Sequence, residues 1–103
     1  MKIIPKKSLG QNFLIDNKIL DQIIKEGDIK KNDKIIEVGP GTGKLTEKIL
    51  EKKPSELTVI EKDEKLASFL HKKFKKNIKI INNDILKVNA NDYLNTENII
   101  IFG

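Results

Sequence analysis

The feature that most constrains the fold of this chain is an alternation between short, β-branched apolar runs and amphipathic stretches. The short runs have the length and composition of buried strands. The amphipathic stretches place apolar residues three and four positions apart, as a helix with one buried face does. Strands and helices in alternation indicate an α/β chain with a mainly parallel, doubly wound sheet. The expected strands cover residues 34–38, 57–60, 78–81 and 98–102, and the expected helices cover 16–26, 43–53 and a stretch that Asp63 caps.

The third expected helix combines an apolar face with a lysine-rich outer face. Its expected inward side chains are Leu66, Phe69, Leu70 and Phe74. Residues 85–97 fit either a short helix or a loop. The last apolar run ends at Gly103, and we expect it to form an unpaired edge of the sheet, which is a poor place for a natural domain to stop. We therefore expect the sequence to be truncated.

Composition narrows the class of protein without deciding its function. A chain of 103 residues has room for one domain. It has no cysteine, and its apolar runs are too short for a membrane span or a signal peptide, so we expect a cytoplasmic protein with no membrane partner. All 20 basic residues are lysines against 15 acidic residues, a net charge of +5. This excess fits a nucleic-acid partner and equally fits a compositional bias.

The stretch EVGPGTGKLT, residues 37–46, follows the first expected strand and looks at first like a phosphate-binding P-loop. The P-loop pattern G-x-x-x-x-G-K-[ST] fails because Val38 stands at its first glycine and Leu45 at its metal-binding hydroxyl. The dinucleotide pattern G-x-G-x-x-G fails because Lys44 stands at its third glycine. Glycines here still let a ligand approach the backbone closely. The loop therefore favours a nucleoside ligand that has no pyrophosphate.

Acidic residues follow the next two strands, and the carboxyl ends of parallel strands are where α/β sheets bind ligands. Glu61 ends the second strand and can accept both hydroxyls of a ribose. Asp84 follows the third strand and can accept a hydrogen bond from the exocyclic amine of an adenine, with Ile85 flanking the ring. Together with Gly39, these residues predict a pocket for S-adenosyl-L-methionine. The nicotinamide pocket of a dehydrogenase remains the alternative.

Four motifs resemble those of the ribosomal RNA adenine N6-dimethyltransferases of the small ribosomal subunit. They are KKSLGQNFLID, IIEVGPGTGKLT, VIEKD and NNDIL, and they cover essentially the whole chain at the expected separations. The large-subunit rRNA methylases that confer macrolide resistance share this layout. They usually lack the Gly-Pro-Gly-Thr-Gly run and the Ser-Leu-Gly before the Gln-Asn-Phe segment. The chain therefore resembles the small-subunit branch.

The resemblance implies a Rossmann-like class I S-adenosylmethionine-dependent methyltransferase fold, of which this chain supplies the first four strands of a mainly parallel sheet. Residues 1–103 would be the N-terminal part of that domain, without its C-terminal part and without the small helical RNA-binding domain. The implied cofactor contacts are Asn12, Leu14, Gly39, Glu61 and Asp84, with Gln11, Gly41 and Ile85 as second contacts.

The family's catalytic motif, Asn-Leu-Pro-Tyr, follows a strand that ends in Phe-Gly. This chain ends at Phe102-Gly103, so the resemblance implies that it holds no catalytic residue and that the motif follows Gly103 directly. The whole protein would dimethylate N6 of two adjacent adenosines near the 3′ end of small-subunit rRNA in an immature subunit, as a monomer without a metal. The 103-residue chain alone would be inactive.

Two further readings stay open: a non-catalytic rRNA-binding assembly factor, and a large-subunit rRNA adenine methylase of the resistance type. The basic leader of Lys2, Lys6 and Lys7 either contacts rRNA phosphates or forms a solvated tail, and we favour the contact. His71, the one histidine, lies on the lysine-rich face of the third expected helix, and we expect it to be solvated.

Overall fold

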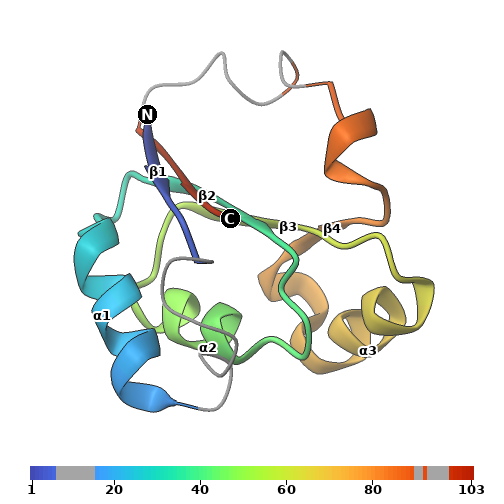
Figure 1. Ribbon diagram of the computed structural model, residues 1–103, viewed down its shortest axis with the longest axis horizontal. Coiled ribbons are helices and arrows are strands. Elements are labelled where there is room, and N and C mark those ends of the chain that lie inside the picture. The colour runs from blue at the N-terminus through green and yellow to red at the C-terminus, as the bar shows by residue number, and fades with distance from the viewer. Residues whose placement is uncertain (7–15, 90–91, 93–97) are drawn as a thin grey trace.

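A computed structural model of the protein describes residues 1–6, 16–89, 92 and 98–103. In these residues one parallel sheet carries three α-helices, and Figure 1 shows all three on the same face of the sheet. The strands are β1 (Lys2–Ile4), β2 (Lys34–Val38), β3 (Glu56–Ile60), β4 (Lys79–Ile81) and β5 (Ile99–Phe102). The helices are α1 (Asn17–Gly27), α2 (Lys44–Glu51) and α3 (Glu64–Phe74), with short 3-10 turns η2 (Lys75–Asn77) and η3 (Ile85–Lys87).

The order of the strands places the end of β2 at a special position in the sheet. The order is β1-β5-β2-β3-β4, and every neighbouring pair is parallel. From β2 the chain proceeds outward through β3 to β4, and it then returns to the opposite side of β2 as β5. Ligands of open α/β sheets bind beyond the carboxyl ends of the strands at such a reversal. The glycine loop follows β2 and therefore occupies this position.

The prediction that the last strand is an unpaired edge is wrong. β5 lies between β2 and β1 and pairs with both, so its backbone groups are used on each side. The added partner β1 is part of the segment predicted to be a basic leader. Two adjacent isoleucines allow this segment to act as a strand: Ile4 is buried against the core, whereas Ile3 faces outward. Without β1, β5 would present an exposed edge with unpaired backbone groups. The short strand β1 pairs with β5 and covers this edge.

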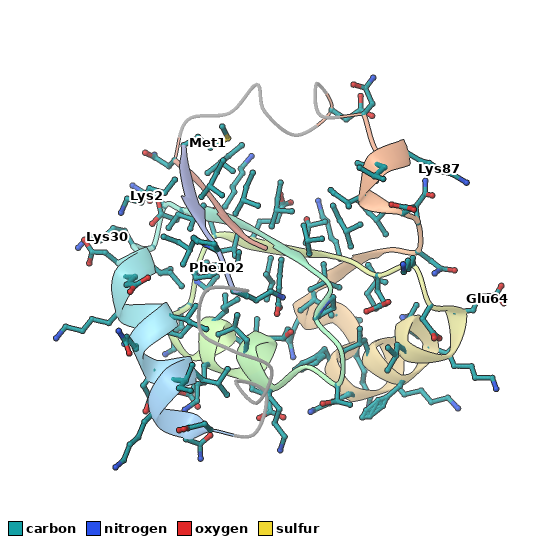
Figure 2. All side chains as sticks on the ribbon, viewed as in Figure 1. Met1, Lys2, Lys30, Glu64, Lys87 and Phe102 are labelled. Carbon is teal, nitrogen blue, oxygen red and sulfur yellow. The ribbon has the colours of Figure 1, made fainter. Side chains whose placement is uncertain are left out.

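The main core fills the space between the sheet and the helices, where Figure 2 shows many side chains converging. Phe102 of β5 is completely buried, and its ring contacts the position where Gly27 of α1 would carry a Cβ, at 2.7 Å. Helix α1 therefore retains a glycine as its last residue because a larger side chain would collide with that ring. Asp28 then takes the left-handed conformation that ends the helix. The fully buried core also includes Leu20, Ile23, Ile35, Leu45, Ile49, Val59, Leu70 and Ile100.

The inward face of α3 is shifted from the predicted one. Leu70 and Phe74 are buried as predicted, whereas Phe69 is 41% exposed and the small Ala67 is buried instead. The buried residues are three and four positions apart, and Phe69 lies outside that stripe. Its ring lies 5.7 Å from the ammonium nitrogen of Lys73, a cation–π arrangement. The expectation of four inward apolar residues was therefore wrong at Phe69. A residue's position around the helix decides whether its side chain is buried, even when that side chain is hydrophobic.

Both predicted aspartate caps are confirmed. The Asp16 carboxylate accepts hydrogen bonds from the first turn of α1, and that of Asp63 accepts from Lys65 and Leu66 at the start of α3. The other face of the sheet carries a smaller apolar cluster, centred on Ile36, Ile60 and Ile99. Of the ambiguous stretch 85–97, the structure describes η3 and a few neighbouring residues.

Candidate functional site

The glycine loop after β2 is built from three glycines in the left-handed conformation. Gly39, Gly41 and Gly43 have φ angles of 66°, 60° and 89°, which other residues adopt only with strain. A Cβ added to Gly39 would meet no atom of the described residues within 4 Å, so this side of the glycine is open to them. A Cβ added to Gly43 would lie 2.6 Å from the Phe74 ring. Gly39 therefore leaves room for a ligand, whereas Gly43 lets α2 pack closely against α3.

The three adjacent strands β2, β3 and β4 end level with one another. Val38, Ile60 and Ile81 are register partners across β2, β3 and β4. The ladder continues one residue further, because the Gly39 N–H donates to the Ile60 carbonyl at 2.9 Å and the Glu61 N–H donates to the Ile81 carbonyl at 2.9 Å. The prediction that strand tips bring Gly39 and Glu61 to one edge of the sheet agrees with this geometry.

The Glu61 side chain is held in one orientation at the tip of β3. It is only 6% exposed, and its Oε2 accepts a hydrogen bond from the Asp63 N–H at 2.9 Å. Asn82, at the tip of β4, donates from Nδ2 to the Glu61 carbonyl at 2.9 Å. The residue that ends β3 is thus fixed from two sides, one through its side chain and one through its backbone. Sequence reasoning missed this role of Asn82, and its only signal was an amide directly after a strand.

Asp84 is the N-cap of η3 and lies three residues after Ile81, the last residue of β4. Its Oδ1 accepts a hydrogen bond from the Leu86 N–H at 2.9 Å, so the carboxylate caps this turn. Ile85, which we expected to flank a ring, is 43% exposed. An aliphatic side chain of this size left partly uncovered beside a carboxylate provides the kind of surface against which a flat ring can pack.

A buried polar cluster lies directly beneath the glycine loop. Glu37 of β2 is 0% exposed, and its Oε1 accepts a hydrogen bond from the Thr46 hydroxyl at 2.5 Å. Its other oxygen, Oε2, lies 3.5 Å from the ammonium nitrogen of Lys6 and has no hydrogen-bond partner among the residues that the structure describes. Burial raises the pKa of Glu37, and the Lys6 charge and the Thr46 hydroxyl act in the opposite direction.

The expectation that Lys6 contacts rRNA phosphates or is solvated is wrong in this structure. Lys6 is 5% exposed, and its ammonium group donates to the Val38 carbonyl at 2.6 Å and to the Gly39 carbonyl at 3.1 Å. Lysine is rarely buried unless its charge is paired, and here a carboxylate and two carbonyls supply the partners. Lys2 is exposed, and its ammonium group donates to the Gly27 carbonyl at 3.2 Å.

Residues 7–15 of the predicted N-terminal motif lie outside the described part of the chain. They include Lys7 and three predicted cofactor contacts, Gln11, Asn12 and Leu14. His71 is exposed, as predicted. Within the described residues, no helix is long and apolar enough to cross a membrane.

The sheet is parallel, a glycine loop lies where its strand order reverses, and a fixed carboxylate lies at the next strand tip. These features define a Rossmann-like domain of the class that binds nucleoside cofactors. Comparison with known proteins assigns the chain more narrowly. The family described as "Ribosomal RNA adenine dimethylase" matches residues 4–103. The chain belongs to this family of methyltransferases.

Curated relatives agree with the small-subunit resemblance. Ribosomal RNA small subunit methyltransferase A of Pelagibacter ubique (strain HTCC1062) is 50% identical over 103 residues, all of this chain and 38% of that protein. The protein of the same name from Sulfurihydrogenibium sp. (strain YO3AOP1) is 44% identical over 98 residues, covering 93% of this chain and 38% of that protein. The chain thus spans 38% of the length of these two relatives.

Solved structures confirm the fold. The crystal structure of the 23S rRNA methyltransferase ErmE matches with a TM-score of 0.68 and 32% identity, over 75% of this chain and 32% of that one. A dimethyladenosine transferase from Plasmodium falciparum matches with a TM-score of 0.67 and 31% identity, over 72% of this chain and 28% of that one. The predicted Rossmann-like methyltransferase fold is therefore confirmed.

Proposed function

We propose that this chain is the cofactor-binding N-terminal part of an S-adenosylmethionine-dependent rRNA methyltransferase. The whole protein would dimethylate N6 of two adjacent adenosines near the 3′ end of small-subunit rRNA in the immature subunit. We place this reaction in the cytoplasm and expect a monomer. The family membership and the small-subunit relatives support the assignment of the substrate.

The single observation that carries the cofactor assignment is the open side of Gly39 beside the fixed Glu61 carboxylate. Among the described residues, nothing lies within 4 Å of the space that a Cβ of Gly39 would fill, and Glu61 directly follows Ile60, whose carbonyl accepts the Gly39 N–H. A nucleoside can approach the backbone at Gly39 while its ribose hydroxyls donate to the carboxylate of Glu61. One oxygen of this carboxylate is already held by Asp63, which keeps the acceptor in position before a ligand arrives.

Asp84 and Ile85 would hold the adenine end of the same ligand. The Asp84 carboxylate would accept a hydrogen bond from the exocyclic amine, and Ile85 would pack on the ring face. Gly41 would contribute a second backbone approach in the loop, and Gln11, Asn12 and Leu14 would cover the methionine end. Bound there, S-adenosyl-L-methionine would supply an electrophilic methyl group, and the residues described here would bind and orient it. No described residue is proposed to act on the target adenine.

Ligand titration followed by NMR of the backbone amides tests the cofactor assignment. We expect S-adenosylhomocysteine to shift the amides of Gly39, Glu61 and Asp84, and NAD to leave them unchanged at the same concentration. Glu61→Gln should weaken S-adenosylhomocysteine binding at least tenfold. Glu56→Gln is the matched control because it makes the same change at the opposite end of β3. Tighter binding of NAD than of S-adenosylhomocysteine would refute the proposal.

A second experiment tests the proposed activity of the whole protein. We expect the protein that continues through Asn-Leu-Pro-Tyr after Gly103 to methylate immature small-subunit particles, and the 103-residue chain to be inactive. Robust methylation by the 103-residue chain would contradict the assignment of the catalytic motif beyond Gly103. Binding to the particles without methylation by the longer protein would instead support the assembly-factor reading.

A further inference from the structure

Lys6 has an unusual environment for a lysine near the start of a chain. Its ammonium group has three hydrogens, and three oxygens surround it: the Val38 carbonyl at 2.6 Å, the Gly39 carbonyl at 3.1 Å and Glu37 Oε2 at 3.5 Å. The residue is 5% exposed, so little water competes for these partners. Neither the glycine motif nor the strand-tip acids account for this lysine.

Two of these partners are successive carbonyls of the glycine loop. Successive carbonyls of an extended strand point in opposite directions, so both can face one cation only where the backbone departs from the strand. Gly39 provides this departure with its φ of 66°. The Val38 carbonyl and the Gly39 N–H belong to one peptide group, and this N–H donates to the Ile60 carbonyl at 2.9 Å. Lys6 therefore bonds to the loop in the conformation that leaves one side of Gly39 without a neighbour among the described residues.

Lys6 is also tied to the end of β5. Its backbone N–H donates to the Gly103 carbonyl at 3.2 Å, and the Gly103 N–H donates to the Ile4 carbonyl at 3.0 Å. The side chain of Lys6 thus reaches the end of β2 while its backbone is bonded to the end of β5. These two strand ends flank the position where the proposed cofactor site meets the proposed catalytic motif.

We propose that Lys6 is a positioning residue that holds the glycine loop in its ligand-accepting conformation and sets it relative to Gly103. The inference rests on the proposed function for the identity of the ligand. The hold on the loop itself depends only on the contacts to the Val38 and Gly39 carbonyls. A role limited to neutralising Glu37 is the competing explanation, and it makes different predictions.

Glu37→Gln separates the two roles because it removes the charge that Lys6 would neutralise. The Thr46 hydroxyl both donates and accepts, so the new amide can turn its oxygen toward Lys6. In the double variant Lys6→Met, Glu37→Gln no buried charge is left unpaired. The loop carbonyls lose their donor, and the introduced amide loses its contact with Lys6. Lys6→Met by itself leaves the buried Glu37 carboxylate without its cationic partner. If this single variant does not fold, the double variant is compared with Glu37→Gln instead.

The decisive comparison is the double variant against Glu37→Gln, with amide hydrogen exchange and an NMR titration with S-adenosylhomocysteine as readouts. We expect exchange at the Gly39 amide to be at least tenfold faster and binding to be at least tenfold weaker in the double variant. Lys2→Met is the matched control, since Lys2 lies in β1 four positions before Lys6 and donates to a carbonyl of α1. This control should change neither readout.

Each outcome decides one part of the inference. Equal exchange at Gly39 in the double variant and in Glu37→Gln would overturn the hold on the loop, whatever the binding result. Faster exchange with unchanged binding would overturn the role toward the ligand. If the unsubstituted chain does not bind S-adenosylhomocysteine and Gly39 exchange is still accelerated, the proposed function fails while the hold of Lys6 on the loop stands.

Discussion

Replacing Gly43 with alanine should destabilise the protein far more than the same change at Gly39, although both glycines belong to one loop. At Gly43 the added Cβ would lie 2.6 Å and 2.8 Å from two ring carbons of Phe74 and 3.2 Å from a methyl carbon of Leu70. Both of those residues are buried, so neither has space to move away. Overpacking of this kind costs about 1–3 kcal/mol. The left-handed backbone at φ 89° adds about 1–2 kcal/mol for a residue with a Cβ.

The expected loss of unfolding free energy for Gly43→Ala is therefore about 2–5 kcal/mol. Gly39→Ala has the backbone cost alone, about 1–2 kcal/mol, because its Cβ would meet no atom of the described residues within 4 Å. The reduced entropy of the unfolded chain affects both variants similarly and cancels in the comparison. Urea unfolding followed by circular dichroism measures both, with unchanged m-values as the condition for comparing them. Equal losses, or a larger loss at Gly39, would refute the reasoning.

Three further predictions concern single side chains. Asp63→Ala removes the cap of α3, and we expect a loss of about 1 kcal/mol in urea unfolding; an unchanged midpoint would show that the cap contributes nothing. Thr46→Val keeps the shape of the side chain but leaves the buried Glu37 Oε1 without its donor, so thermal unfolding should report a loss of about 1–3 kcal/mol, with Thr46→Ser recovering part of it. Burial raises the pKa of Glu37 above its ordinary value of 4.5, so the folded protein binds this proton more tightly than the unfolded chain does. The resulting contribution to stability is complete below the unfolded pKa and is lost as the pH rises through the folded pKa. The unfolding free energy of the wild type relative to Glu37→Gln should therefore fall as pH rises from 4.5, and a constant or rising difference would count against this assignment.

The site could be predicted where a residue's position follows from the strand that precedes it. Gly39 and Glu61 extend directly from β2 and β3, whose bounds the apolar runs indicate, and parallel pairing then brings the two tips together. Asp84 was predicted on the same reasoning, and its capping of η3 fits a residue just beyond a strand. The predicted contacts at Gln11, Asn12 and Leu14 lie outside the described residues and remain predictions.

The site could not be predicted where it depends on contacts between distant segments. Lys6 meets Val38 and Gly39 across more than 30 positions of sequence. In a chain with 20 lysines, none of the local patterns distinguishes this one from its exposed neighbours. Asn82 was missed for the same reason, because its amide bonds to a carbonyl of another strand.

The sequence by itself determined the order of β2 to β5 and of the three α-helices, the capped starts of α1 and α3, and the acidic residue at the tip of β3. These features depend on interactions within a few residues: periodic burial, a side chain that accepts from its own helix, and the end of an apolar run. Only the tertiary structure decided that β5 is flanked on both sides, that Phe69 faces outward and that Lys6 is buried beneath the glycine loop. Strand neighbours, helix rotation and the pairing of a buried charge are each set by which surfaces pack together in space, and a linear pattern does not encode which surfaces these are.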